Sequence, residues 1–310
     1  MLEELLNESG IVLAECAVAE RMRRMPGVEL HPTLFNAALI YGPESSREAM
    51  AGIYRGYLEI ARAAGRPMLL TAPTWRLDAE RLAAAGMPPS MVVDAVAFLR
   101  ALRDEAALGQ PPVLVGGLVG PRGDCYRPDH APGTAEAERF HEWQVGQLVD
   151  GGAEFLLAQT MPSVAEAAGI ARLMSGTGKP FIISFCTGPD GRVLDGTALP
   201  EAMERIDAAV PAGNRPVGYF VNCTHPRFLL SAYQEGELGR LIGIQANGSS
   251  RDVRQLDGSA ATVTDPIASW SEAMAEVHRR FGVAVLGGCC GTGVDHLAAL
   301  ADMTPALSRP

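Results

Sequence analysis

The chain has 310 residues, which is enough for one large α/β domain or for two ordinary domains. Hydrophobic residues make up 47% and charged residues 20%, so the composition predicts a soluble globular protein with a large core. The net charge of −10 disfavours nucleic acid as a partner, and the absence of a long apolar run or a basic leader predicts a cytoplasmic protein without a membrane span.

Short apolar runs alternate along the chain with longer stretches of helical period. This is the pattern of βα units that build a parallel sheet. The apolar runs are rich in valine, isoleucine, leucine and phenylalanine. In chain order the predicted strands are Ile11–Cys16, Pro67–Thr71, Val113–Gly117, Glu154–Thr160, Pro180–Phe185, Val217–Asn222, Leu241–Gln245 and Val283–Gly287.

Helices are predicted between and after these strands, and glycines such as Gly151 and Gly152 mark their ends. They are Ser45–Ala64, Pro88–Leu108, Ala135–Asp150, Ser163–Ser175, Ala198–Ala209, Phe228–Tyr233, Pro266–Phe281 and a last helix from Val294 onward. Eight strands with eight helices favour a closed (β/α)8 TIM barrel over a doubly wound sheet.

No linker, low-complexity tract or internal repeat divides the chain, so residues 1–310 are expected to form a single barrel domain. The longest irregular stretch, Gly120–Gly133, follows the third strand and is a candidate active-site loop. In such a barrel the residues just past the strand ends meet at one mouth. Here those residues are Cys16, Gln159, Cys186, Cys223, Cys289 and Cys290.

Adjacent cysteines directly after the last strand give the strongest local signal. Cys289 and Cys290 are flanked by glycines on both sides, and Cys223 follows the sixth strand, so three thiols could meet. Three thiolates with a fourth position open describe a catalytic zinc site, because structural sites use four protein ligands. The alternatives are small buried residues and a glycine-rich loop that cradles a phosphate.

The remaining cysteines, Cys16, Cys125 and Cys186, are expected to pack in the core or in loops, not to bind the metal. In a cytoplasmic chain of this size disulfides are not expected. His296, four residues past Thr292, is interpreted as a helix residue or a neighbour of the site rather than as a fourth ligand.

The sequence resembles the zinc- and homocysteine-dependent S-methyltransferase family over nearly its whole length. The resemblance depends on Gly287-Gly288-Cys289-Cys290-Gly291-Thr292 with His296, on Val221-Asn222-Cys223, on Gly116-Gly117-Leu118-Val119-Gly120-Pro121, on Ser184-Phe185 and on Leu194-Asp195-Gly196-Thr197. It implies a barrel, zinc on Cys223, Cys289 and Cys290, and transfer of a methyl group to a thiol, most simply homocysteine in methionine synthesis. The implied donor is a small methyl sulfonium or ammonium compound, or a methyl carrier on a separate protein.

Several positions depart from the family's pattern. Where the first strand usually ends in Asp-Gly this chain has Glu15-Cys16, Glu20 stands where threonine is usual, and the fourth strand ends in Gln159-Thr160 in place of Glu-Thr. In the family the two carboxylates help to hold the amino group of homocysteine. The resemblance therefore implies a substrate pocket with Glu15, Cys16, Gln159 and Asn222, in which Gln159 is neutral.

Three functions remain open at this stage. The first is zinc-dependent methyl transfer from a small donor to homocysteine, and the second is methyl transfer or demethylation with a different thiol acceptor or carrier. The third is a non-catalytic barrel that binds zinc. Tyr126, Trp143 and Trp75 are candidates for contact with a cationic methyl group through their ring faces. The sequence gives no indication of the oligomeric state.

Overall fold

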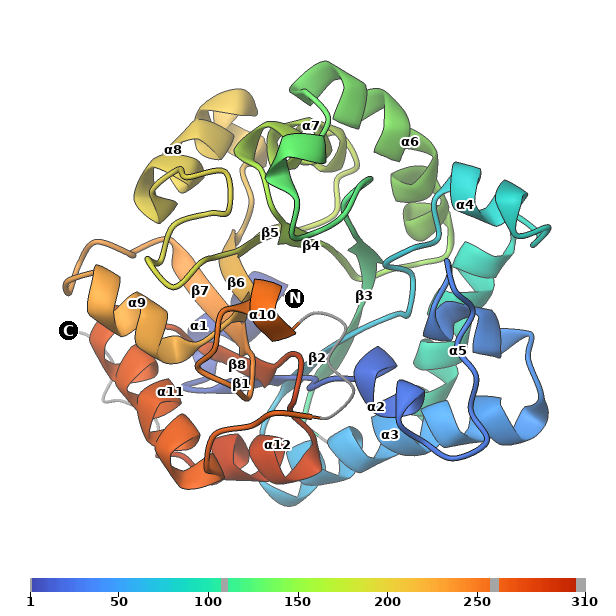
Figure 1. The fold of residues 1–310 in the computed structure, drawn as a ribbon, viewed down its shortest axis with the longest axis horizontal. Helices are drawn as coiled ribbons and strands as arrows, with labels where there is room; N and C mark the ends of the chain where they lie inside the picture. Colours follow the sequence, from blue (N-terminus) through green and yellow to red (C-terminus); the bar gives the residue numbers. More distant parts are fainter. Residues whose placement is uncertain (1, 107–110, 257–261, 305–310) are drawn as a thin grey trace.

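The computed structural model describes residues 2–106, 111–256 and 262–304. Eight parallel strands form a closed barrel in chain order, and a ring of helices surrounds it (Figure 1). The strands are β1 Val12–Ala14, β2 Met68–Thr71, β3 Val113–Val119, β4 Phe155–Met161, β5 Phe181–Cys186, β6 Gly218–Thr224, β7 Leu241–Ala246 and β8 Val285–Gly288. The predicted (β/α)8 TIM barrel and all eight predicted strands are confirmed.

The helices are α1 Leu2–Glu8, α2 Ala19–Arg23, α3 Glu44–Ala63, α4 Ala79–Ala84, α5 Met91–Ala106, α6 Thr134–Asp150, α7 Val164–Ser175, α8 Leu199–Ala209, α9 Pro226–Ala232, α10 Val253–Leu256, α11 Ile267–Phe281 and α12 Val294–Ala301. The long helices begin and end close to their predicted bounds. The end of the predicted Pro88–Leu108 helix lies partly outside the described residues. The short helices α1, α2, α4 and α10 were not predicted, because four to seven residues are too few for a clear helical period.

Pairing of β1 with β8 closes the barrel, with Val12 opposite Val285 and Leu13 opposite Leu286. One apolar layer packs between the strands and the surrounding helices, and a second fills the barrel itself. Leu2 and Leu5 of α1 belong to the inner layer. Helix α1 therefore packs against the barrel interior from the end where β1 begins, which leaves the other end for a site.

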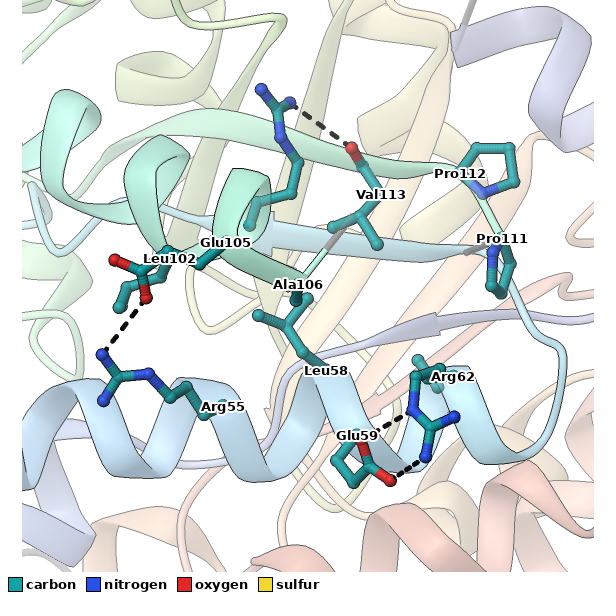
Figure 2. A pocket seen from close by; sticks show the side chains of 12 residues that line it. Arg55, Leu58, Glu59, Arg62, Leu102, Glu105, Ala106, Pro111, Pro112 and Val113 are labelled. Atoms are coloured by element: carbon teal, nitrogen blue, oxygen red, sulfur yellow. Dashed lines mark hydrogen bonds and ion pairs between the residues drawn. The ribbon is translucent and has the colours of Figure 1, made fainter. Parts of the chain in front are cut away.

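A hollow of about 550 Å³ lies between α3 and α5 (Figure 2). Val113, the first residue of β3, borders it, so the hollow lies toward the ends where the strands begin, away from the cysteines. Two ion pairs lie in this hollow, Arg55 with Glu105 and Arg62 with Glu59, so these charged side chains already have partners in the protein. None of the helices in the described part of the chain is both long and apolar enough to cross a membrane.

Two glycines inside the barrel make room for aromatic rings. An added Cβ at Gly243 would lie 2.3 Å from the Phe220 ring, and one at Gly116 would lie 2.4 Å from the Phe155 ring. Both glycines face the phenylalanine paired with them on the neighbouring strand. The rings can fill the interior only because these two positions have no side chain.

We predict that Gly243→Ala lowers the free energy of unfolding by about 1–3 kcal/mol, because a methyl group against Phe220 overpacks the barrel. The matched control is Gly52→Ala on α3, where an added Cβ meets nothing within 4 Å. This control should stabilise by up to about 1 kcal/mol through helix propensity. Thermal denaturation followed by circular dichroism measures both, and equal melting temperatures for the two variants would contradict the packing argument.

Candidate metal and substrate site

A cavity of about 370 Å³ opens at the ends of the strands opposite α1. Its wall comes from strand ends and the loops that follow them, so segments far apart in the sequence share one space. The predicted residues that line it are Glu15, Cys16, Gln159, Cys223, Cys289 and Cys290. The structure thus brings together the residues selected from the sequence, except Asn222 and Cys186.

Cys223, Cys289 and Cys290 form a group whose ligand atoms all lie within 4.8 Å of one another. The sulfur atoms of Cys223 and Cys289 are 3.1 Å apart. Within the described residues, this is the one set of three or more histidine, cysteine and acidic side chains close enough to share a metal ion. The three cysteines predicted as ligands therefore meet in a geometry suited to a metal.

The backbone of β6 is strained where it places Cys223. Cys223 has a φ of 50° and Thr160, at the end of β4, has a φ of 66°, and both strands have a register shift here. Side chains other than glycine rarely adopt this left-handed region. Such strain persists only when surrounding contacts enforce it.

Asn222 supplies these contacts. Its Oδ1 accepts hydrogen bonds from Thr160 N at 2.9 Å and from Ser184 Oγ at 2.7 Å, while its Nδ2 donates to Thr160 Oγ1 at 2.8 Å and to Cys223 Sγ at 3.4 Å. The side chain is fully buried and does not line the cavity. Predicted as a substrate residue, Asn222 is instead placed where it joins the two strained strand ends and orients Cys223.

The loop that carries Cys289 and Cys290 is held from several sides. Cys289 N donates to Ala246 O at 2.7 Å, and Gly248 N donates to Cys290 O at 2.8 Å. The carboxylate of Glu20 accepts a hydrogen bond from Gly291 N, where the backbone has a φ of 77°. Glu20, one of the departures from the family's pattern, therefore fixes the loop beside the two thiols.

Hydrogen bonds among the three thiols of the cluster give them different pKa values. Donation from Cys223 and Cys290 holds the pKa of Cys289 well below that of an ordinary thiol. The corresponding bonds raise the pKa of Cys223. The bond to Cys223 lowers the pKa of Cys290, but the bond to Cys289 and burial raise it on balance. Tyr126, from the predicted loop Gly120–Gly133, donates its hydroxyl to Cys223 Sγ at 3.7 Å.

The other three cysteines lie outside this cluster. Cys16 lines the cavity but is buried, which raises its pKa to about 12. Burial also raises the pKa of Cys186 well above the usual value, and Cys186 does not line the cavity. Cys125 lines the cavity from the loop after β3. Their positions, outside the group whose sulfur atoms could share one ion, are what separates these three cysteines from Cys223, Cys289 and Cys290.

Glu15 presents a buried carboxyl group to the same cavity. Its two oxygens accept hydrogen bonds from Thr71 N at 3.2 and 3.0 Å, and Thr71 Oγ1 donates to one of them. Burial raises the pKa of Glu15 from 4.5 to about 7, although the bonds from Thr71 oppose this rise. A cation placed within about 4–6 Å would favour the charged form of this carboxyl group.

Gln159 is connected to Glu15 through a second amide. Gln159 Nε2 donates to Gln245 Oε1 at 2.6 Å, and Gln245 Nε2 donates to the backbone oxygen of Glu15 at 3.2 Å. Trp75 Nε1 donates to Gln159 O at 3.2 Å. Gln245 and Thr71 were not selected from the sequence, although each stands at or next to the end of a predicted strand.

The three aromatic candidates have different positions. Trp75 and Tyr126 line the cavity, whereas Trp143 lies on α6 and packs against the outer core. Trp143 therefore cannot contact a substrate in this cavity. His296, on α12, is buried edge-on against the Trp270 ring at 5.0 Å between centroids and is not part of the thiol cluster.

Comparison with known proteins agrees with this geometry. Residues 12–304 match the sequence family described as homocysteine S-methyltransferase. Homocysteine S-methyltransferase YbgG of Bacillus subtilis is 22% identical over 99% of this chain and 98% of its own length. Homocysteine S-methyltransferase of Escherichia coli is 26% identical over 96% of this chain and 97% of its own length.

The metallated form of the homocysteine methyltransferase MmuM from Escherichia coli has the same fold, with a TM-score of 0.74 at 22% identity over 97% of this chain and 98% of that one. The likeness of fold and the family match both extend over nearly the whole chain. The chain therefore belongs to the homocysteine S-methyltransferase family and is an S-methyltransferase of that family.

Proposed function

We propose that the protein is a zinc-dependent enzyme that transfers a methyl group from a small sulfonium or ammonium donor to the thiol of homocysteine. Cys223, Cys289 and Cys290 would hold the zinc. The observation that carries the proposal is the convergence of these three thiols on one side of a cavity that also contains the Glu15 carboxyl group.

The residues fit zinc in both chemistry and spacing. Sulfur atoms that share one tetrahedral zinc at about 2.3 Å are about 3.8 Å apart. The three thiols, with Cys223 and Cys289 at 3.1 Å and all ligand atoms within 4.8 Å, bracket this separation. Thiolates select zinc over hard cations such as magnesium or calcium. When bound, zinc lowers the pKa of a thiol in its open position, so that a nucleophilic thiolate exists at neutral pH.

Glu15 would bind the ammonium group of homocysteine. The carboxyl group is buried, lines the cavity and is held by Thr71, so it is already oriented before a substrate arrives. The amide oxygen of Gln159 is the second group available there, since its Nε2 is engaged by Gln245. The pocket thus offers one carboxylate and one neutral amide to the amino group.

The protein must also align the methyl donor with the acceptor thiol. A sulfonium donor releases a neutral sulfide when its methyl group is transferred, so it needs little activation and mainly requires in-line placement. Tyr126 lies against Cys223 and lines the cavity, so its side chain limits where the methyl group can approach the sulfur.

A second candidate keeps the same chemistry with a different thiol acceptor. It is favoured by the neutral Gln159, whose amide is bonded to Gln245 where a second carboxylate would strengthen the hold on an ammonium group. A grid of methyl donors against thiol acceptors, measured on zinc-loaded protein, separates the two candidates. Efficient use of homocysteine supports the first, and preference for another thiol supports the second.

We predict about one zinc per chain, and loss of both zinc and activity in Cys223→Ala, Cys289→Ala or Cys290→Ala with the barrel still folded. The thiols lie at strand ends in a small cluster of their own, apart from the two large apolar layers of the barrel. Metal analysis and circular dichroism measure the two properties. Zinc should also bind more weakly as pH falls, because protons compete for the thiolates.

Cys16→Ser, Cys125→Ser and Cys186→Ser are the matched controls, because these thiols lie outside the cluster. Each should keep full zinc content. Full occupancy in a variant that lacks Cys223, Cys289 or Cys290 would refute the assignment. Loss of zinc in Cys16→Ser would instead indicate a closed site with four cysteines, which would argue against catalysis.

Glu15 should make stability depend on pH. Its pKa is raised from 4.5 to about 7 in the folded protein, so the folded state binds the proton more tightly than the unfolded state does. The contribution of this difference to the free energy of unfolding is complete below about pH 4.5 and is lost as pH rises through 7. Relative to Glu15→Gln, the wild type should therefore lose on the order of 3 kcal/mol over this window. Unfolding measured at several pH values tests this, and Glu272→Gln, at an exposed position, should show no such difference.

Gln159 should influence the choice of acceptor more than folding or zinc content. We predict that Gln159→Glu improves the use of homocysteine by about tenfold or more, because a second carboxylate faces the ammonium group. The Gln245 amide must turn over to donate to the new carboxylate. Steady-state kinetics with homocysteine measures the effect, and an efficient wild type that gains nothing would show Gln159 to be a neutral variation.

A further inference from the structure

Arg76 brings a positive charge into the substrate cavity without a partner for it. It stands five residues past Thr71, in the loop after β2, and lines the cavity. Its Nε is buried and has no hydrogen-bond partner. Over the described ranges Arg76 also makes no ion pair, and burial lowers its pKa. Arginine nonetheless stays charged in proteins, so the charge awaits compensation.

The acidic residues nearest to Arg76 are engaged elsewhere. Asp78 accepts hydrogen bonds from Arg81 N at 3.0 Å and from the Arg81 guanidinium. Asp124 lines the cavity, and its Oδ1 accepts a hydrogen bond from Tyr126 N at 2.9 Å. Neither comes within 4 Å of the Arg76 nitrogens in the part of the chain that the structure describes. Asp124 and Asp78 therefore act on Arg76 only from a distance, and no ion pair neutralises its guanidinium within the described residues.

Aromatic rings hold the guanidinium in place. Phe35 and Trp75 stack with their centroids 6.0 Å apart, and the guanidinium carbon of Arg76 lies 5.1 Å from the first ring and 4.8 Å from the second. Arg23 places a second guanidinium 5.8 Å from the Phe35 ring and also lines the cavity. A guanidinium over a ring still has its N–H groups free to bind a carboxylate in its plane.

Charged groups of both signs line the cavity, and two of its acids, Glu20 and Asp124, already accept hydrogen bonds from backbone N–H groups. Glu15 presents a carboxyl group, whereas Arg76 and Arg23 present cations whose aromatic contacts leave less ring surface for a cationic methyl group. A plain methylated cation would be repelled at the arginine end. A molecule that carries both an ammonium and a carboxylate group would satisfy both ends.

We propose that Arg76, with Arg23 beside it, binds the carboxylate of an amino-acid substrate and makes the enzyme selective for carboxylate-bearing substrates over their decarboxylated analogues. This proposal rests on the proposed function, because it assigns a substrate class to the same cavity. The carboxylate could belong to the acceptor or to the donor. Both offer the same chemistry to a guanidinium, so the experiment has an arm for each.

The test measures binding by calorimetry on zinc-loaded protein with two matched pairs of ligands. L-homocysteine is compared with 3-aminopropanethiol, and S-methyl-L-methionine with (3-aminopropyl)dimethylsulfonium. The members of each pair differ by the carboxylate alone. We expect the wild type to bind at least one carboxylate-bearing ligand tenfold or more tightly than its analogue, which corresponds to about 1.4 kcal/mol.

Arg76→Gln should remove this preference, and Arg76→Lys should retain part of it because the charge remains. Arg127→Gln is the matched control, since Arg127 is exposed, pairs with Asp129 at 2.9 Å and does not line the cavity. Circular dichroism and zinc content confirm that each variant is folded and loaded. A loss confined to homocysteine assigns the acceptor's carboxylate to Arg76, and a loss confined to the sulfonium compound assigns the donor's.

An equal affinity for both members of each pair in the wild type, or an unchanged preference in Arg76→Gln, would overturn the proposal. Methyl transfer and zinc content are measured on the same wild-type preparation. Absence of transfer together with an intact carboxylate preference would refute the proposed function and leave the Arg76 site standing. Transfer to homocysteine without any carboxylate preference would support the proposed function and refute the role of Arg76.

Discussion

Closure of the barrel by the pairing of β1 with β8 is the constraint on which the site depends. Cys223 and Cys289 are 66 residues apart in the sequence, yet their sulfur atoms lie 3.1 Å apart. They meet because every strand runs in the same direction, so that all strand ends open at one mouth. Glu15 on the chain just after β1 reaches the same space only because β1 lies next to β8.

Strained backbone at two strand ends then sets the detailed position of the groups that closure brings together. The left-handed residues Thr160 and Cys223 each cost on the order of 1–3 kcal/mol. Asn222 offsets this cost through four hydrogen bonds that join β4, β5 and the Cys223 sulfur. The barrel can tolerate such strain because the strands stay paired on either side of each register shift. The direction of the Cys223 thiol is thus fixed by a side chain that does not line the cavity.

The sequence predicted the strands well because apolar runs and glycine stops are local signals. It also placed Glu15 and the three cysteines of the thiol cluster at strand ends, and closure makes strand ends adjacent. It could not show that Asn222 bonds to the neighbouring strands in place of lining the cavity. Nor could it show that Gln245 joins Gln159 to Glu15, or that Trp143 packs against the outer core. These outcomes depend on side-chain direction and on partners distant in the chain. Arg76 was missed because a single arginine in a loop has no pattern.

Glu15 and Arg76 are related by the effect that one kind of ligand would have on both of them. Burial works against the charged form of Glu15 and of Arg76 alike, which is why the pKa of the acid is raised and that of the base is lowered. Neither group pairs with the other in the described structure. Amino-acid substrates would relieve both penalties, with an ammonium group at Glu15 and a carboxylate, of the acceptor or of the donor, at Arg76. Part of the selectivity of the pocket would then come from charge left uncompensated in the free enzyme, which no uncharged or singly charged ligand can relieve.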